Sequence, residues 1–153
     1  MFTVDEPAAG ELRIAADDEY ELYVNGQKIG DGRSYRELDE YNITKFIKRG
    51  RNTLAVRVNN RRGSTAALVA RIFLREKNDG WVTYSTDETW RTNIRPFPFW
   101  NATAYNDRHW KGAQAFGKLG DTVPWDRQED VASTETHRSE RFRISKEFEV
   151  QRV

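Results

Sequence analysis

The sequence predicts an all-β protein, an antiparallel β-sandwich, and three segments support that prediction. Residues 20–24 alternate apolar and polar side chains, and Asn25-Gly26 follows them directly. Asn-Gly supplies the two positive-φ positions of a type I′ turn, so residues 27–30 should return beside residues 20–24 as a hairpin. Residues 52–58 show the same period of two, and residues 66–74 form an apolar run bounded by turn residues. Such segments are typical of stacked antiparallel sheets.

The chain before the hairpin is expected to add two strands. Residues 2–4 should form a short edge strand, and the turn-prone segment 6–10 follows it. Residues 12–16 alternate large apolar side chains with polar or small ones, which predicts a strand with one buried face. The acidic pair Asp17-Asp18 then forms a turn that leads into the hairpin.

After the hairpin we expect a turn, an extended segment and one or two short helical turns. Residues 30–32, Gly-Asp-Gly, are the turn, and residues 34–38 are the extended segment. Residues 43–47 place apolar side chains at helical spacing. Asn42 can cap this segment, and Gly50 can take the left-handed conformation that ends a helix.

The second half of the sandwich begins after a polar loop at residues 61–64. Residues 66–74 fit a helix by periodicity alone, but their alternation and flanking turns favour a central strand. Residues 78–80 read as a turn, and residues 81–84 as the strand that pairs across it.

The composition of the remaining chain changes twice. Residues 86–125 hold four of the five tryptophans and few alternating runs, which indicates long loops with short strands around the sandwich. Residues 126–140 are polar and nearly free of large apolar side chains, as a linker is. Residues 141–153 are apolar again. They are either the start of a following domain or an edge strand that returns to the sandwich, whose predicted extent is residues 1–125.

Composition excludes several classes of function. Lysine and arginine number 25 against 24 aspartates and glutamates, so nucleic acid and anionic membranes are poor candidates for partners. No apolar run approaches the length that spans a bilayer, so membrane insertion is not expected. Cysteine is absent, which removes disulfides, thiolate catalysis and cysteine-ligated zinc or iron–sulfur sites.

Seven short motifs follow one another along the chain in a set order. They are Asp17-Asp-Glu-Tyr20, Val24-Asn-Gly26, Tyr41-Asn-Ile-Thr44, Gly50 to Val58, Thr86 to Trp90, Asp107 to Trp110 and Pro124-Trp125. This ordered set resembles the galactose-binding-like β-sandwich domain, and in particular the N-terminal accessory domains of bacterial α-L-rhamnosidases. The resemblance implies a jelly roll that serves as a non-catalytic carbohydrate-binding or accessory module of a larger secreted or periplasmic bacterial protein. A polysaccharide or glycan and neighbouring domains of the same chain are the implied partners.

The tail at residues 141–153 also resembles the opening of a propeller-type domain found after such modules in large planctomycete-type secreted proteins. On that resemblance the chain is one module followed by the first strand of its neighbour.

The loop around Trp100 is the first candidate binding site. Indole and phenol rings stack on the apolar faces of sugars, while amides and carboxylates hydrogen-bond the hydroxyl groups. Trp100, Asn101, Tyr105 and Asp107 combine these groups within a few residues. The alternative is that aromatic residues here are structural, and for Trp90, Trp110 and Trp125 we expect a role in the core or as a lid.

A second candidate is the loop of Asn60, Arg61 and Arg62. Guanidinium groups bind carboxylates through paired N–H donors, so this loop suits an acidic sugar. A merely solvated loop is the competing interpretation.

The sequence gives little support to an enzyme. Its carboxylates occur as adjacent pairs, and neighbours on an extended chain point to opposite sides. Only two histidines are present, which excludes a histidine-rich metal site. No cofactor is expected apart from a possible structural calcium ion, for which Asp17, Asp18 and Asp31 are weak candidates, and a turn-forming role suits them better.

Two rival functions remain open. A structural interdomain scaffold that binds no sugar would use the aromatic loop as an interface. An independent hydrolase would need two carboxylates, distant in the sequence, that converge on a cleft.

Overall fold

The computed structural model describes residues 1–61, 66–78, 80–95, 97–118 and 149–152. The predicted linker at residues 126–140 lies outside these ranges, and the boundaries proposed for the tail stay a prediction. Within the described part of the chain, no helix is long and apolar enough to cross a membrane.

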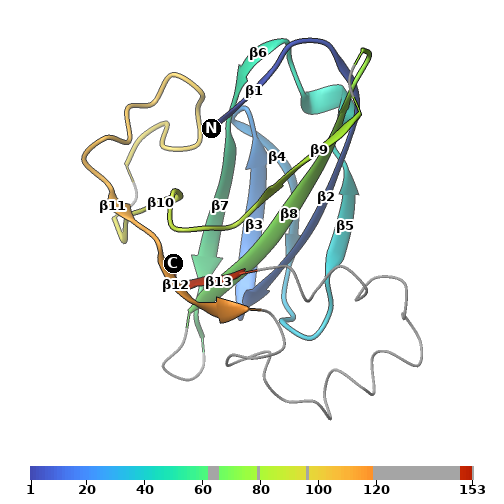
Figure 1. Ribbon diagram of the computed structural model, residues 1–153. Helices are drawn as coiled ribbons and strands as arrows, with labels where there is room; N and C mark the ends of the chain where they lie inside the picture. The colour runs from blue at the N-terminus through green and yellow to red at the C-terminus, as the bar shows by residue number, and fades with distance from the viewer. Residues whose placement is uncertain (62–65, 79, 96, 119–148, 153) are drawn as a thin grey trace.

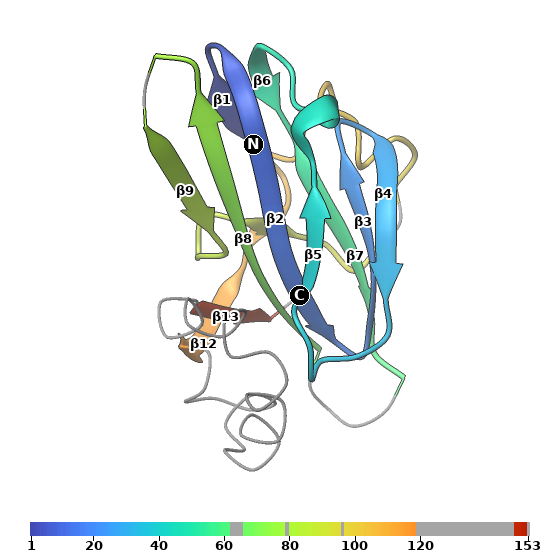
Figure 2. The same ribbon diagram turned by 90° about the vertical axis from the view of Figure 1, so that its right-hand side faces the viewer.

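Two antiparallel sheets face each other across the core, as the sequence predicts for a β-sandwich (Figures 1 and 2). The larger sheet has the order β12-β13-β8-β2-β5, with β9 also paired to β8, and the smaller has the order β4-β3-β7. Two short ladders, β1-β6 and β10-β11, lie outside these sheets. The strands are β1 (Phe2–Val4), β2 (Pro7–Asp17), β3 (Glu19–Val24), β4 (Gln27–Gly32), β5 (Asp39–Asn42), β6 (Gly50–Asn52), β7 (Leu54–Asn59), β8 (Ala67–Glu76), β9 (Trp81–Ser85), β10 (Arg91–Thr92), β11 (Lys111–Gly112), β12 (Gln114–Lys118) and β13 (Glu149–Arg152).

The predicted hairpin is confirmed. Asn25 and Gly26 have φ values of 52° and 82°, the two positive values that a type I′ turn requires. β4 therefore returns beside β3, and β7 pairs with the opposite edge of β3, where Leu22 lies opposite Val56. The predicted strands at residues 2–4, 52–58, 66–74 and 81–84 are also present, within a residue or two at their ends.

Two predicted turns are wrong, because both segments belong to strands. Pro7 opens β2, a position where its missing N–H costs no ladder bond. β4 continues through Gly30 and Gly32, where glycine is needed for space rather than for a turn. A Cβ on Gly30 would lie 2.4 Å from the Tyr41 ring, and one on Gly32 would lie 2.3 Å from the Tyr20 ring.

The segment between β4 and β6 also differs from expectation. Residues 34–38 form no strand, with bends at residues 35–37, and β5, which the sequence did not predict, comes directly after them. The expected helical segment is a single 3-10 turn, Thr44–Phe46, and Asn42 Oδ1 accepts a hydrogen bond of 3.0 Å from the Thr44 amide. Gly50 does have a positive φ of 85°, but the helical turn has already ended before it.

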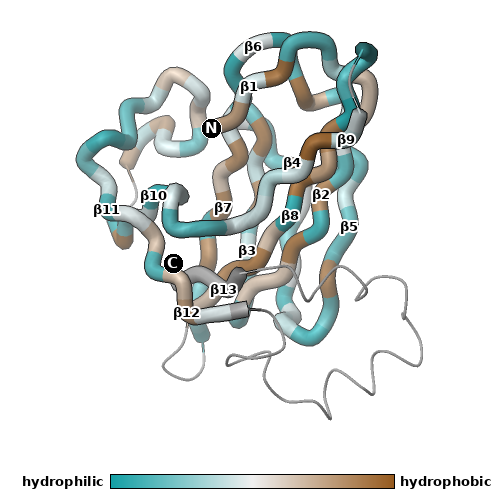
Figure 3. The backbone as a smooth tube through the Cα atoms, viewed as in Figure 1, coloured by the Kyte–Doolittle hydropathy of each residue, from teal (hydrophilic) through white to brown (hydrophobic). Residues whose placement is uncertain are grey.

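The core lies between the two sheets and takes alternate residues of β2, β3 and β8. Figure 3 shows hydrophobic residues recurring along these strands. Leu12 and Ile14 of β2 and Leu22 and Val24 of β3 are completely buried. Each such side chain contributes roughly 1.5–3 kcal/mol through removal from water. β8 adds Leu68, Ile72 and Leu74.

One lateral edge of the sandwich is held by tyrosines. Tyr20 of β3 is 2% exposed, and its hydroxyl donates to Asp39 Oδ2 at 2.5 Å, across to β5 of the other sheet. The Tyr41 hydroxyl lies 2.9 Å from the Tyr20 hydroxyl. Burial, followed by the hydrogen bond to Asp39, raises the pKa of Tyr20 far above its ordinary value, so the phenol stays protonated.

Two side-chain amides join the top of the smaller sheet to its neighbours. Asn52 is fully buried, and its amide makes four hydrogen bonds, to the Lys48 N–H and C=O, the Gly50 C=O and Asn25. Asn25 in turn bonds to the Phe46 C=O and the Thr53 N–H. Both amides therefore use their donors and acceptors fully.

We expect Asn52→Ala to destabilise the fold by about 3 kcal/mol. Removing the amide leaves several buried polar groups without partners, each at a cost of about 1–3 kcal/mol, of which local relaxation recovers part. Urea unfolding measures the change, with the exposed Asn93→Ala as the matched control. Equal stability of the two variants would contradict this account of Asn52.

Candidate functional site

Trp100 lies at the centre of a cluster of aromatic rings outside the core. Its ring is 5.7 Å from that of Tyr23 in an edge-on arrangement and is stacked 6.4 Å from that of Trp110. Tyr105 packs edge-on against Trp110 at 5.7 Å, and its hydroxyl accepts a 3.3 Å hydrogen bond from the Trp110 indole N–H. These contacts hold Trp100 half-buried, with part of its surface open to water.

The loop that carries Trp100 is ordered by its own turns and by one bond to the hairpin. Backbone hydrogen bonds link Trp100 to Phe97, Ala102 to Phe99 and Tyr105 to Ala102. The Thr103 hydroxyl donates to Asn25 Oδ1 at 3.1 Å. The position of Trp100 is thus tied to the turn between β3 and β4.

Two similar turns place the other tryptophans. Trp90 N–H bonds to the Asp87 C=O at 3.2 Å, and Trp110 N–H bonds to the Asp107 C=O at 2.8 Å. Directly after each tryptophan the chain enters a short strand, β10 or β11, and these two strands pair with each other. The β10-β11 ladder therefore holds the two Asp-x-x-Trp turns side by side.

A groove of about 370 Å³ lies where this cluster meets the open side of the sandwich. Trp90, Trp100 and Trp110 line it, together with side chains of the N-terminus, β7, β8 and β9. Polar groups at the groove come from Thr53, Thr89, Arg91, Thr92 and Asp107. This combination offers flat apolar surfaces together with hydrogen-bond donors and acceptors.

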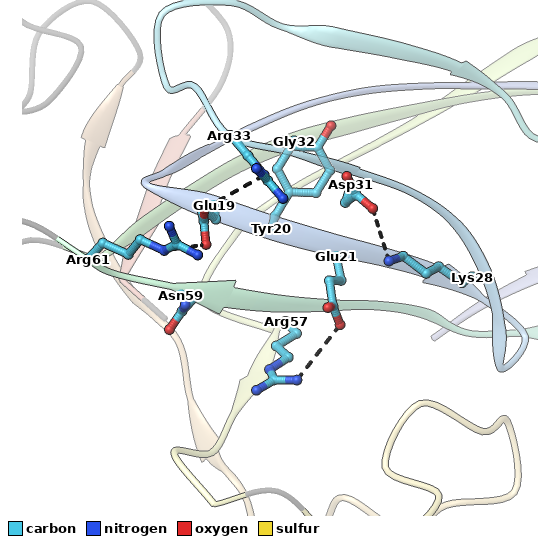
Figure 4. A pocket seen from close by; sticks show the side chains of 10 residues that line it. All are labelled: Glu19, Tyr20, Glu21, Lys28, Asp31, Gly32, Arg33, Arg57, Asn59 and Arg61. Atoms are coloured by element: carbon cyan, nitrogen blue, oxygen red, sulfur yellow. Dashed lines mark ion pairs between the residues drawn. The ribbon is translucent and has the colours of Figure 1, made fainter.

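A second, charged cleft of about 320 Å³ lies over the outer face of the β4-β3-β7 sheet (Figure 4). Arg61 Nε is 2.9 Å from Glu19 Oε2, and Lys28 Nζ is 3.0 Å from Asp31 Oδ2. Longer ion pairs link Arg33 to Glu19 and Arg57 to Glu21. We call this feature the charged cleft. Its lining residues are Glu19, Tyr20, Glu21, Lys28, Asp31, Gly32, Arg33, Arg57, Asn59 and Arg61.

The structure divides the predicted site residues between these two places, which share no lining residue. Trp100 and Asp107 line the groove, whereas Tyr105 packs against Trp110. Asn101 follows Trp100 in the same loop, is half-buried and does not line the groove. Arg61 lines the charged cleft, where its neighbour in the lining is Asn59 rather than Asn60. Arg62 and Trp125 lie outside the described residues.

The sequence analysis missed several groove residues, chiefly Trp90, Arg91 and Tyr84. One local signal was available for the first two. The sequence contains Asp-x-x-Trp followed by a basic residue twice, at residues 87–91 and 107–111. Tyr84 and the N-terminal residues reach the groove only through tertiary packing, for which the sequence has no local signal.

The three aspartates considered for calcium have other partners. Asp18 Oδ2 accepts a hydrogen bond of 2.7 Å from the Arg61 amide, and Asp31 pairs with Lys28. Asp17 is 8% exposed at the end of β2. Among the described residues, no three acidic, histidine or cysteine side chains are grouped as ligands for a metal ion. Structural calcium stays a prediction.

The strand order and the similar solved structures show a galactose-binding-like β-sandwich fold. The chain is similar to an α-L-rhamnosidase of Streptomyces avermitilis solved with L-rhamnose, at 23% identity and a TM-score of 0.75, over 82% of this chain and 13% of that chain. It is similar to a lectin of Pleurotus ostreatus in complex with GalNAc, at 25% identity and a TM-score of 0.73, over 81% and 37% of the two chains. For the apo form of that lectin the identity is 31% and the TM-score 0.70, over 79% and 35%. No protein-family model and no curated protein matches the sequence.

These similar structures are much longer than the part that this chain matches. The chain spans between 13% and 37% of the length of the structures just named. The likeness to the rhamnosidase is therefore a likeness of fold to one part of a larger protein.

We expect the ionisation of Asp17 to destabilise the folded protein. Burial raises its pKa to about 6, and the hydrogen bond and charge of Asp18 add to that shift. The unfolded chain, with a carboxyl pKa near 4, binds the proton less tightly. The free energy of unfolding should therefore fall as the pH rises from about 4 to about 6, by roughly 2 kcal/mol.

Asp17→Asn should remove most of this fall, because the amide cannot ionise. Urea unfolding across that pH range measures it, with the exposed Asp5→Asn as the matched control. Parallel pH profiles for the wild type and Asp17→Asn would show that Asp17 does not titrate in this way.

Proposed function

We propose that this chain is a non-catalytic carbohydrate-binding module, an accessory part of a larger secreted bacterial protein. The groove carries the proposal, because Trp90, Trp100 and Trp110 line one cavity that also receives Arg91 and Asp107. Indole rings stack on the C–H faces of sugar rings, while a guanidinium and a carboxylate hydrogen-bond the hydroxyl groups. Small-ligand sites commonly combine a mainly apolar lining with a few polar groups in this way.

The similar structures support this reading. The Pleurotus ostreatus lectin was solved in complex with GalNAc, and the Streptomyces avermitilis enzyme with L-rhamnose. The chain matches only 13% of the enzyme, as an accessory domain would. Bacterial origin and export from the cell belong to the proposal and rest on the resemblance of the sequence motifs.

The absence of catalysis is proposed from the carboxylates at both cavities. Glycoside hydrolysis requires two carboxyl groups across one scissile bond, one of them protonated as the general acid. Asp107 is the one carboxylate among the described side chains that line the groove. In the charged cleft Glu19 and Glu21 are each paired with an arginine, and the hydrogen bond from Lys28 lowers the pKa of the Asp31 carboxyl.

We expect Trp100→Ala to weaken binding to a glycan at least tenfold, because the variant loses the stacking surface. The measurement is a screen of neutral and acidic glycans on an array, followed by calorimetric titration of the strongest ligand. Trp81→Ala is the matched control, since Trp81 is 53% exposed on β9 and does not line the groove. Repeating the titration with calcium and then with chelator tests the predicted ion.

Trp100 also packs on Tyr23 and Trp110, so thermal unfolding must accompany the titration. Arg91→Ala is a second groove variant that removes no ring contact, and it should weaken the same ligand. Binding to none of the glycans, or an equal loss of affinity in Trp81→Ala and Trp100→Ala, would overturn the proposal.

The second candidate function is a structural interdomain scaffold that binds no sugar, and the exposed apolar surface of β9 favours it. In this edge strand Trp81, Val82 and Tyr84 are exposed at 53%, 42% and 38%. Exposed edge strands usually carry charged side chains that oppose association, and β9 has none, so its apolar surface suits an interface with another domain. A scaffold predicts no glycan binding by the isolated module. It also predicts that amide hydrogens of β9 exchange more slowly in a longer chain that includes the neighbouring domain.

A further inference from the structure

We propose that the charged cleft is a second saccharide-binding site and that it selects a sugar bearing a carboxylate, such as a uronate. The inference rests on the proposed function and names the class of ligand that the module prefers. It starts from Arg33, Arg57 and Arg61, three guanidinium groups gathered over one face of a three-stranded sheet (Figure 4).

The strand registers bring the charges together. Side chains alternate along a strand, so Glu19 and Glu21 point away from the core into which Tyr20 and Leu22 are buried. On the neighbouring β7, Asn59 lies opposite Glu19 and Arg57 lies opposite Glu21. On the other side, β4 places Asp31 opposite Glu21. The sheet itself therefore brings Glu19, Glu21, Asp31, Arg57 and Asn59 together, while Arg33 and Arg61 come from the chain just beyond β4 and β7.

Two of the guanidinium groups have donors that their ion pairs leave available. Arg33 Nε is 3.8 Å from Glu19 Oε1, and Arg57 Nη1 is 3.9 Å from Glu21 Oε2. Both distances exceed that of a hydrogen bond. The two side chains are 80% and 66% exposed, respectively. A ligand carboxylate can accept two parallel N–H bonds from such a group without burying an unpaired charge.

The carboxylates of the cleft restrict which anion fits. Glu19, Glu21 and Asp31 lie among the cationic groups, so a densely charged polyanion would meet repulsion as well as attraction. The same carboxylates, with the Asn59 amide, accept hydrogen bonds from hydroxyl groups. A ligand with one carboxylate per ring and several hydroxyls satisfies both sets of groups. The cleft volume of about 320 Å³ lies in the range of small-ligand sites.

Tyr23 connects this cleft to the aromatic groove. Its hydroxyl donates to Glu21 Oε2 at 2.8 Å, and its ring contacts Trp100 at 5.7 Å. The charged cleft and the groove are thus separate cavities on either side of one tyrosine. An acidic oligosaccharide can contact both, and the charged cleft would then provide the preference for acidic units.

The test compares polygalacturonate with its fully methyl-esterified form, which has the same rings without the charges. We expect the wild type to bind the acidic polymer about tenfold more tightly at low salt, and this preference should shrink as salt screens the charges. Arg57→Gln should remove most of the preference and leave binding to the ester unchanged. Arg51→Gln, an exposed arginine on β6 outside the cleft, is the matched control and should behave as the wild type.

Each result decides between the two proposals. Equal affinity of the wild type for both polymers, or an unchanged preference in Arg57→Gln, overturns the charged cleft and leaves a Trp100-dependent module intact. Acid binding that survives Trp100→Ala but is lost in Arg57→Gln supports the charged cleft as a site separate from the groove. Binding to neither polymer overturns the charged cleft, whereas the groove is overturned only by the absence of binding across the whole glycan array. If Arg57→Gln unfolds, Arg33→Gln, next to β4 on the opposite side of the cleft, provides the same test and should also reduce the preference for the acidic polymer.

Discussion

The side-chain amides of Asn25 and Asn52 connect four parts of the chain that are distant in the sequence. One N–H of the Asn25 amide donates to Phe46, the last residue of the 3-10 turn, and the other donates to Asn52. The Asn25 oxygen accepts hydrogen bonds from the backbone N–H of Thr53, directly before β7, and from the hydroxyl of Thr103 in the tryptophan loop. Because Asn25 has to adopt a positive φ to close the hairpin, the geometry of this turn also sets the place of the loop. The proposed binding surface is therefore an extension of the hairpin, and its shape depends on the same buried polar network that orders the smaller sheet.

That smaller sheet works on both of its faces. Inward, Tyr20, Leu22 and Val24 fill the core, and outward, Glu19 and Glu21 line the charged cleft while Tyr23 donates a hydrogen bond to Glu21. A slip of one residue in β3 would exchange the two faces, burying the carboxylates and exposing the core. The register that buries the core is thus the same register that gathers the charged side chains of the proposed site.

Local patterns predicted the elements whose signals are contained within a few residues. Asn25-Gly26 defined the hairpin, and alternation defined β7 and β8. The glycines at 30 and 32 were assigned to a turn because glycine often means one, whereas here they make room for the rings of Tyr41 and Tyr20, which pack against them from other strands. The groove was predicted only through Trp100 and Asp107, since its other walls come from β7, β8, β9 and the N-terminus. Arg61 was predicted to act together with Arg62 in a binding loop. In the structure Arg61 forms an ion pair with Glu19, which the β3-β7 ladder brings close to it.

The gathering of three indoles at one cavity gives the molecule an internal optical reporter. Trp100 and Trp110 are stacked with ring centres 6.4 Å apart and planes 19° from parallel, close enough for their excited states to couple. A molecule entering the groove would change the solvent contact of both rings and perturb that coupling, which near-ultraviolet circular dichroism records directly. Trp81, exposed on a different strand, contributes a signal that such an event leaves alone. Occupancy of the groove can therefore be followed on the unlabelled protein, apart from whatever happens at the tryptophan-free charged cleft.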